Sequence, residues 1–512
     1  MLFNSYEFIF LFLPITLLVF FSIGGRGHHR IAIAWLVGAS LFFYGWWNPA
    51  YLGLILASIL FNYATGVALL SQPSTSLRFA SLRFASRGII LLFGICVNLF
   101  LLGYFKYANF FVDNLNSLSG STFHLETIIL PLAISFFTFQ QITYLVDAYK
   151  GETREYNFLH YCLFVTFFPQ LIAGPIVHHR EMLPQFAKST IYKLNYDHLA
   201  VGLTIFFLGL FKKVFLADGV AVYATPVFDA AEQGLTLSFF EAWAGALAYS
   251  LQLYFDFSGY SDMAIGIARM FGVRLPLNFN SPYKAINIID FWRCWHMTLS
   301  RFLRDYVYIP LGGNRKGKWR RYVNLMITML LGGLWHGAGW TFVAWGALHG
   351  FYLMINHGWR TLRRALGHDL SCSSWWGRGL SLLITFMAVV VAWVFFRAES
   401  FGGAMMVLEG MSGVNGFSLP LAWLQKAGSL AVLENLGIGF EIMVTGFNKF
   451  WVINIFFTLL IVWFMPNTQQ FMYGKIRWQW QASPAWAVSM ALVATVAVLS
   501  LTRVSEFLYF QF

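Results

Sequence analysis

The stretch LGGLWHGAGW at 331–340 places an imidazole, His336, among glycines in an otherwise apolar segment. A buried polar ring in a membrane is costly, and glycine weakens a helix, so a segment that only spans lipid favours neither residue. The pattern indicates a place where a polar group comes close to the backbone. We expect the glycines to let substrate reach His336. A satisfied structural histidine is the alternative interpretation.

A second histidine lies in FWRCWHMTLSRFLRDY at 291–306. At 100° per residue, Trp295 falls on an apolar arc, whereas His296, Arg301 and Asp305 fall on the polar side. The pattern predicts one amphipathic helix, which either lies at an interface or lines a cavity. Arg301 and Asp305 are four residues apart and are expected to form an ion pair.

Other polar residues have a structural interpretation as well as a functional one. Asp256 and Asp262 flank SGYS, which predicts a helix break carrying two acids at membrane depth. We interpret them as fold determinants or gates rather than as catalysts. His349 follows His336 on the next helix and is expected to be its structural partner. The adjacent histidines at 178–179 fall in a basic loop and are expected to be solvated.

Several known catalytic signatures are missing from the sequence. The chain has no nucleophile elbow, P-loop, GxGxxG or HExxH, which argues against hydrolysis and nucleotide cleavage. Its four cysteines form no CxxC, so neither a metal site nor a disulfide framework is expected. The candidate chemistry that remains is general-base catalysis by an imidazole, which suits acyl transfer because a base takes the proton of the acceptor. Arg315, Lys316 and Lys318 belong to a cationic cluster that either binds the phosphates of coenzyme A or anchors the topology.

The composition places these segments in a membrane. Hydrophobic residues make up 58% of the 512 residues and charged residues 11%, against roughly 25% charged in soluble proteins. About thirteen apolar runs approach the ~20 residues that a span requires, and the abundant Phe and Trp are expected to pack between helices. The excess of 34 Lys and Arg over 22 Asp and Glu is typical of cytoplasmic loops, so no nucleic acid partner is expected.

The loop cations predict the topology of this multi-pass protein. Cationic loops follow the first, third and fifth runs and are assigned to the cytoplasm. The sixth run, 158–176, contains two prolines and a glycine and is expected to re-enter rather than span. The segment 322–357 is predicted to form a hairpin that starts and ends in the cytoplasm. The N-terminus, a segment at about 399–448 and the C-terminus are then expected in the periplasm.

Long motifs are distributed along the whole chain. The longest are FWRCWHMTLSRFLRDYVYIPLGGNR at 291–315 and LLGGLWHGAGWTFVAWGALHG at 330–350. They are accompanied by QLYFDFSGYSDMAIG, LIAGP, FKKVFLAD, VFFRAE and the terminal FLYFQF. Together these motifs resemble the membrane-bound O-acyltransferase (MBOAT) superfamily, in its bacterial AlgI-like branch, which acetylates exported polysaccharides.

The resemblance implies an all-α polytopic fold, with about 11–13 transmembrane or re-entrant helices around a central tunnel. It matches His336 to the active-site histidine of the family, acting as the catalytic base, and His296 to its second motif histidine. It implies acetyl-CoA as the cytoplasmic donor, no permanently bound cofactor or metal, an exported polysaccharide as acceptor, and periplasmic acetylation proteins as partners. The residues expected to line or support the tunnel are Asp305, Trp295, Trp335, Asp256, Asp262 and His349.

One membrane domain is expected over 1–512, located in the bacterial inner membrane. It comprises N-terminal helices at 8–147, a core with re-entrant and amphipathic segments at 158–358, and C-terminal helices at 379–512. The favoured function is O-acetylation of an exported polysaccharide such as alginate, cellulose or peptidoglycan. A transporter or channel is one alternative, and an acyltransferase for a lipid or a protein is another.

Overall fold

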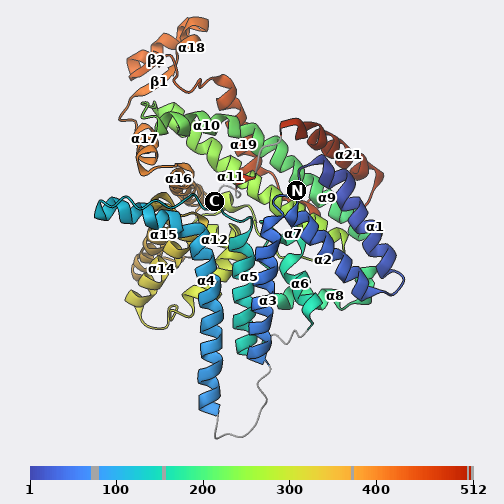
Figure 1. Ribbon diagram of the computed structural model, residues 1–512. Helices are drawn as coiled ribbons and strands as arrows, with labels where there is room; N and C mark the ends of the chain where they lie inside the picture. Colours follow the sequence, from blue (N-terminus) through green and yellow to red (C-terminus); the bar gives the residue numbers. More distant parts are fainter. Residues whose placement is uncertain (71–79, 153–156, 371–373, 504–506, 509–512) are drawn as a thin grey trace. The chain divides into compact units, whose positions relative to one another are not determined.

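The computed structural model describes the chain except for residues 71–79, 153–156, 371–373, 504–506 and 509–512. Cys372 and the last four residues of FLYFQF lie outside the described residues. Within the described ranges the chain consists of helices and two short strands, as Figure 1 shows. The all-α prediction is therefore confirmed.

Four helices of the described chain are long and apolar enough to cross a membrane. They are Ala50–Leu70, Ser86–Ser119, Tyr196–Glu232 and Trp375–Arg397. Shorter apolar helices cover Phe8–Gly24, Lys449–Phe464 and Pro484–Leu499. Their length and composition fit a polytopic membrane protein, as predicted.

The chain divides into two compact units. The first comprises Met1–Leu210, Tyr260–Leu277 and Gln481–Val504, and the second comprises Phe211–Gly259, Asn278–Trp480 and Ser505–Phe512. Helix α11 (Phe239–Met270) contributes residues to both units. The other helices of the first unit are α1 (Leu13–Gly24), α2 (His29–Gly45), α3 (Ala50–Leu70), α4 (Ala80–Ser119), α5 (Ile134–Lys150), α6 (Phe158–Thr166), α7 (Phe168–Leu171), α8 (His179–Phe186), α9 (Tyr196–Phe211) and α21 (Pro484–Leu499). The second unit contains α10 (Asp218–Glu232), α12 (Ile288–Cys294), α13 (Met297–Leu303), α14 (Lys318–His336), α15 (Trp340–Ala365), α16 (Trp375–Arg397), α17 (Phe401–Ser412), β1 (Phe417–Pro420), α18 (Leu421–Lys426), β2 (Ile438–Glu441), α19 (Lys449–Phe464) and α20 (Thr468–Tyr473).

In the first unit, buried amides link the long apolar helices. Asn98 of α4 donates to the side-chain oxygen of Asn62 on α3 at 2.6 Å, and Asn62 donates back at 3.1 Å. Gln141 of α5 donates to the hydroxyl of Ser58 on α3 at 2.9 Å. Because polar groups in an apolar interior must be paired, these bonds fix which faces of α3, α4 and α5 meet.

The segment 158–176 is broken, as its prolines and glycine predict. Helix α6 ends at Thr166 and α7 covers only four residues, so neither reaches the ~20 residues of a span. The two histidines that follow, His178 and His179, are only 5% and 8% exposed. The prediction that they are solvated is wrong, because this loop packs into the first unit instead of extending into water.

The second unit has an aromatic core. Trp393 of α16 lies 4.9 Å from Trp295 and 5.6 Å from Trp345 of α15, measured between ring centroids. All three rings are almost completely buried. Aromatic pairs at these separations attract one another beyond their burial, so the predicted packing of aromatic residues between helices is confirmed.

A small module follows α17 in the second unit. Strands β1 and β2 pair in parallel, with Phe417 opposite Ile438 and Pro420 opposite Glu441. Figure 1 shows these strands together with α18, beyond α17. The module lies within the 399–448 segment, which the sequence assigns to the periplasm.

Candidate active site

His336 is the last residue of α14, where the helix gives way to an extended backbone. Gly337 and Gly339 have φ values of −159° and −163°, and α15 begins at Trp340. The two helices form the predicted hairpin, and Figure 1 shows them side by side. His336 is 3% exposed, so its ring lies inside the unit.

Aromatic rings surround the His336 imidazole. Trp335 lies at 4.7 Å, Trp345 at 5.1 Å and Phe396 at 5.1 Å, each between ring centroids and each roughly edge to face. Trp335 also lies 6.0 Å from the ring of His296. The two predicted site histidines therefore share Trp335 as a neighbour.

The glycines of the hairpin serve helix packing. A β-carbon at Gly333 would lie well under 3.0 Å from the backbone oxygen of Phe342, and one at Gly346 would lie equally close to the backbone oxygen of Met329. A β-carbon at Gly337 would overlap the Phe342 ring. At these positions the prediction of room for substrate is wrong, because α15 itself fills the space next to the glycines of α14.

His296 interrupts the predicted amphipathic helix. Helix α12 ends at Cys294 and α13 begins at Met297, while His296 adopts φ +39° and ψ 56°. This left-handed conformation is rare for a residue with a β-carbon. The prediction of one continuous helix over 291–306 is wrong, although the segments on either side of the break are helical as expected.

Asn278, from a distant segment, holds the chain at this break. Its side-chain oxygen accepts hydrogen bonds from His296 Nδ1 at 2.9 Å, from the backbone N of Thr298 at 3.3 Å and from Thr298 Oγ1 at 2.9 Å. Its backbone oxygen accepts from the N of Met297 at 2.9 Å. The first N–H groups of a helix lack partners within it, so Asn278 caps α13.

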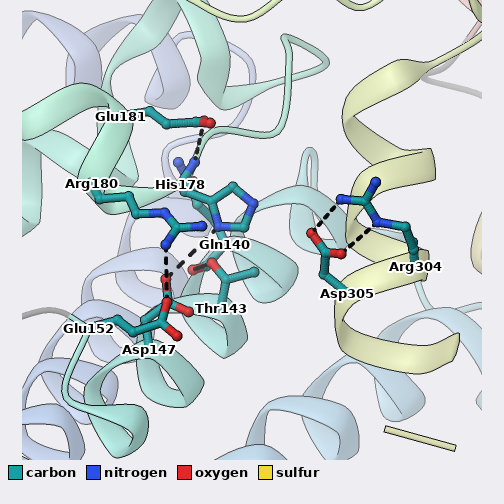
Figure 2. A network of polar contacts seen from close by, with 9 residues as sticks. All are labelled: Gln140, Thr143, Asp147, Glu152, His178, Arg180, Glu181, Arg304 and Asp305. Carbon is teal, nitrogen blue, oxygen red and sulfur yellow. Dashed lines mark hydrogen bonds and ion pairs between the residues drawn. The ribbon is translucent and has the colours of Figure 1, made fainter. Parts of the chain in front are cut away.

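Asp305 pairs with its neighbour in the chain. Arg304 Nε donates to Asp305 Oδ1 at 2.7 Å and Arg304 Nη2 donates to Asp305 Oδ2 at 3.1 Å, as Figure 2 shows. This hydrogen bonding raises the pKa of Arg304 above its ordinary value. Arg304 thus engages both carboxylate oxygens of Asp305, and it is not the partner, Arg301, that the sequence predicted.

His349 is fully buried on α15 among aromatic rings. Trp345 lies at 4.8 Å and Trp292 at 5.1 Å from its ring centroid. Neither ring nitrogen has a hydrogen-bond partner among the residues that the structure describes. His349 is therefore not hydrogen-bonded to His336, and the prediction that it is the structural partner of His336 is wrong; the two rings only share Trp345 as a neighbour.

Asp256 belongs to a buried charge cluster. Lys213 Nζ lies 2.7 Å from Asp256 Oδ1 and 2.9 Å from Asp218 Oδ1. The backbone N of Leu508 donates to Asp256 Oδ2 at 3.1 Å. Asp256 thus links α11 to two distant parts of the chain, in agreement with its interpretation as a fold determinant.

The helix break predicted between Asp256 and Asp262 is absent, because α11 is continuous from Phe239 to Met270. Asp262 is 7% exposed and belongs to the first unit. Tertiary packing overrides the weak helix propensity of SGYS. In the first unit, Gly266 lies so close to α9 that a β-carbon there would meet the backbone of Phe206.

The cations Arg315, Lys316 and Lys318 are exposed and lie at or just before the start of α14. His336 lies at the other end of this 19-residue helix. A rise of about 1.5 Å per residue separates the two ends by about 27 Å. These cations therefore cannot contact a group that reacts at His336.

A further polar cluster lies in the first unit. His178 Nδ1 lies 3.9 Å from Asp147 Oδ2, and both side chains are buried. Figure 2 shows Glu181 accepting from the backbone N of His178 at 3.2 Å and Glu152 accepting from Arg180 at 3.2 Å. The buried carboxylate of Asp147 gives His178 a polar partner in the interior of the unit. The sequence around His178 did not indicate this partner.

Two residues of these networks were not singled out by the sequence. Asn278 lies in LPLNFN, which has no distinctive local pattern. Lys213 lies in FKKVFLAD. A lysine within an apolar run indicates that it needs a charged partner, and this was the available signal. Within the described ranges, no three His, Cys, Asp or Glu side chains group as metal ligands.

The apolar helices, the hairpin with His336 at the end of its first helix, and the second histidine at a helix break agree with one class of protein. The model of the membrane-bound O-acyltransferase family matches residues 82–395, and the chain belongs to this family. It is therefore a membrane acyltransferase, which decides against the transporter or channel alternative.

Similar proteins carry related names. The chain is 48% identical to a peptidoglycan O-acetyltransferase of Helicobacter pylori, over 82% of this chain and 81% of that protein. It is 40% identical to a probable alginate O-acetylase AlgI of Pseudomonas putida, over the full length of both. A teichoic acid D-alanyltransferase of Streptococcus thermophilus is 27% identical over 52% of this chain and 68% of that protein.

Proposed function

We propose that this protein takes acetyl from cytoplasmic acetyl-CoA and passes it across the membrane for O-acetylation of an exported polysaccharide. The observation that carries the proposal is the pair of buried imidazoles, His336 and His296, which both lie next to Trp335. The names of the relatives, which concern peptidoglycan and alginate, support a polysaccharide as the class of acceptor.

In this proposal His336 is the catalytic base. Its ring takes the proton from the acceptor hydroxyl, while the hydroxyl oxygen forms a bond to the acetyl carbon and the carbon–sulfur bond of the thioester breaks. The leaving thiolate keeps the bonding electrons and then receives the proton from the imidazolium. His336 ends α14, where the helix dipole presents partial negative charge to a cation such as this imidazolium.

In this proposal the cations at the start of α14 bind the donor substrate, acetyl-CoA. Coenzyme A carries several phosphates, and Arg315, Lys316 and Lys318 are exposed and close together in the chain. Guanidinium and ammonium groups form charge-assisted hydrogen bonds with phosphate oxygens. Their distance from His336 is compatible with a donor that is long, because its phosphates and its thioester lie at opposite ends.

The proposed setting is the bacterial inner membrane, with both termini and the 399–448 segment in the periplasm. The segment contains the β1 and β2 module, with few cations. A periplasmic module is a suitable place for the partner proteins that complete the transfer to the polymer.

The test is transacetylation in vesicles that contain the full-length protein and radiolabelled acetyl-CoA on the cytoplasmic side. Label in the polysaccharide fraction supports the proposal, whereas label in extracted lipid or in protein supports the alternative acceptors. His336→Ala should lose about 10²–10⁴-fold in rate, the usual contribution of a general base, while its expression and detergent stability stay close to the parent. A folded His336→Ala variant with the parental rate would exclude His336 as the base.

A further inference from the structure

The segment 421–446 is apolar, and yet none of it is buried. It comprises α18, a 3₁₀ helix at Gly428–Leu436 and strand β2. Fifteen of its 26 residues are hydrophobic, a share like the 58% of the whole membrane protein, and three are charged. The structure describes every residue of this segment, and none of them is buried. Apolar surface of this extent marks a place that a membrane or another protein covers.

The 3₁₀ helix of the segment has one leucine face. Leu430, Leu433 and Leu436 are three residues apart, and a 3₁₀ helix has three residues per turn, so these side chains lie in one row. Glu434 lies on a different face of the same helix. Leu436 is 74% exposed, and Ile442, which follows β2, is 85% exposed. The described chain therefore leaves the end of the leucine face and Ile442 uncovered.

Hydrogen bonds and ring contacts place the segment beside the first turn of α19. The backbone N and Oγ1 of Thr445 donate to Oε1 of Glu241 on α11, at 3.1 Å and 2.7 Å. The ring of Trp423 on α18 lies 6.0 Å from that of Phe447, and the Phe447 ring lies 5.8 Å from that of Trp451 on α19. The beginning of α19 and the segment 421–446 are therefore close together.

The length of α19 brings this place to the boundary of the bilayer. Its 16 residues rise about 24 Å at about 1.5 Å per residue, which is less than the ~30 Å hydrocarbon core. A short span is accommodated where the bilayer thins around it or where flanking residues enter the boundary layer. The residues 442–447, IMVTGF, precede α19 almost directly and are mostly apolar. They lie at the boundary in either case.

We infer that the segment 421–446 is an interfacial membrane anchor, whose leucine face and Ile442 insert among the acyl chains while Glu434 stays in water. The covering surface is lipid because the exposed apolar residues lead directly into α19. On α19 itself, side chains such as Phe456, which is 57% exposed, face the bilayer. The anchor keeps the paired strands β1 and β2 at the membrane surface.

The charges of the segment argue against an electrostatic anchor. It contains one lysine and two glutamates, so it has no excess of cations for anionic lipids. The strength of such binding then depends on the apolar area that is buried in the boundary layer. Vesicles of phosphatidylcholine and vesicles that also contain phosphatidylglycerol are therefore expected to hold the segment equally.

Fluorescence quenching in vesicles tests this position with the full-length protein alone. Leu436→Cys, Ile442→Cys and Glu434→Cys are made where alanine replaces the four native cysteines, and each carries the environment-sensitive dye NBD. With fewer than one protein per vesicle, the dyes at 436 and 442 should emit at shorter wavelength and be quenched by phospholipid with a doxyl group on its acyl chain. The dye at 434, the matched control, should instead be quenched by aqueous iodide.

A dye on Phe456→Cys is the reference for lipid exposure on α19. If doxyl lipid quenches this dye but iodide alone quenches those at 436 and 442, the inference is wrong, and another protein or a second copy covers the surface. Quenching by doxyl lipid that appears only with phosphatidylglycerol would also contradict an apolar anchor.

Photolabelling of the unmodified protein covers the case in which a cysteine variant fails to fold. A phospholipid with a diazirine on its acyl chain should form adducts in peptides from 430–444 as well as from α19, mapped by mass spectrometry. Adducts on α19 without any in 430–444 would refute the anchor. No acyl transfer is measured in either experiment, so a failure of the proposed function leaves both results readable.

Discussion

Two adjacent glycines of the hairpin, Gly332 and Gly333, are expected to differ sharply when each is replaced by alanine. A β-carbon at Gly333 would lie against the backbone oxygen of Phe342, and backbone cannot move aside as a side chain can. At Gly332 the nearest atom is the Leu303 Cδ1 at 3.2 Å, at the end of a flexible side chain.

The magnitudes follow from packing and helix propensity. Overpacking of a tight core costs about 1–3 kcal/mol, and more where backbone must shift, so Gly333→Ala should destabilise by at least that amount. Replacing glycine by alanine inside a helix gains about 1 kcal/mol, which should offset the small adjustment at Leu303 in Gly332→Ala. Gly332→Ala is therefore expected to be near neutral.

Thermal unfolding of both variants in the same detergent measures the difference. Gly333→Ala should unfold at a clearly lower temperature than Gly332→Ala, and the loss should appear without any substrate. Equal unfolding temperatures would refute the packing interpretation. A Gly333→Ala variant that is stable but inactive would instead restore the interpretation that this glycine leaves room for substrate.

Three further predictions concern the donor side, the buried charges and the topology. Replacing Arg315, Lys316 and Lys318 by glutamine should raise the KM of acetyl-CoA with little change in kcat, and an unchanged KM would leave these cations a topological role only. Lys213→Met should destabilise the protein by about 3–5 kcal/mol, because it leaves buried carboxylates without their cation, and a parental unfolding temperature would contradict this. A cysteine in place of exposed Gln425 should react with a membrane-impermeant maleimide added to intact cells, and protection of this cysteine would refute the periplasmic assignment.

The hairpin was predictable because its signals are local. Two apolar runs, a cationic start and a glycine-rich turn lie within one short segment, and the structure ends α14 at His336 as that pattern indicates. The burial of the ring also follows from the apolar residues on both sides. What the local pattern could not give is the partner of each glycine, since this depends on the register between α14 and α15.

The break at His296 and the charge cluster depend on contacts between residues far apart in the chain. The helical wheel of 291–306 is regular, and the αL conformation of His296 is stabilised by Asn278. Asp256 was recognised as costly in an apolar helix, but its partner Lys213 lies on another helical segment. Single-sequence reasoning identifies such polar residues as needing partners, and only the fold supplies the partners.

In the proposed reaction, helix α14 sets the distance between the two ends of the bound donor. One end carries the exposed cations and the other carries His336, and no hinge interrupts the helix between them. A compact acetyl donor such as acetyl phosphate, whose anionic group is bonded directly to the acetyl, could occupy one end but not both. In the proposed reaction, a donor that binds at both ends bridges a backbone separation of about 27 Å, less the reach of the cationic side chains and of the imidazole. Shortening α14 by whole turns would then change which donors fit, while leaving every side chain of the two ends intact.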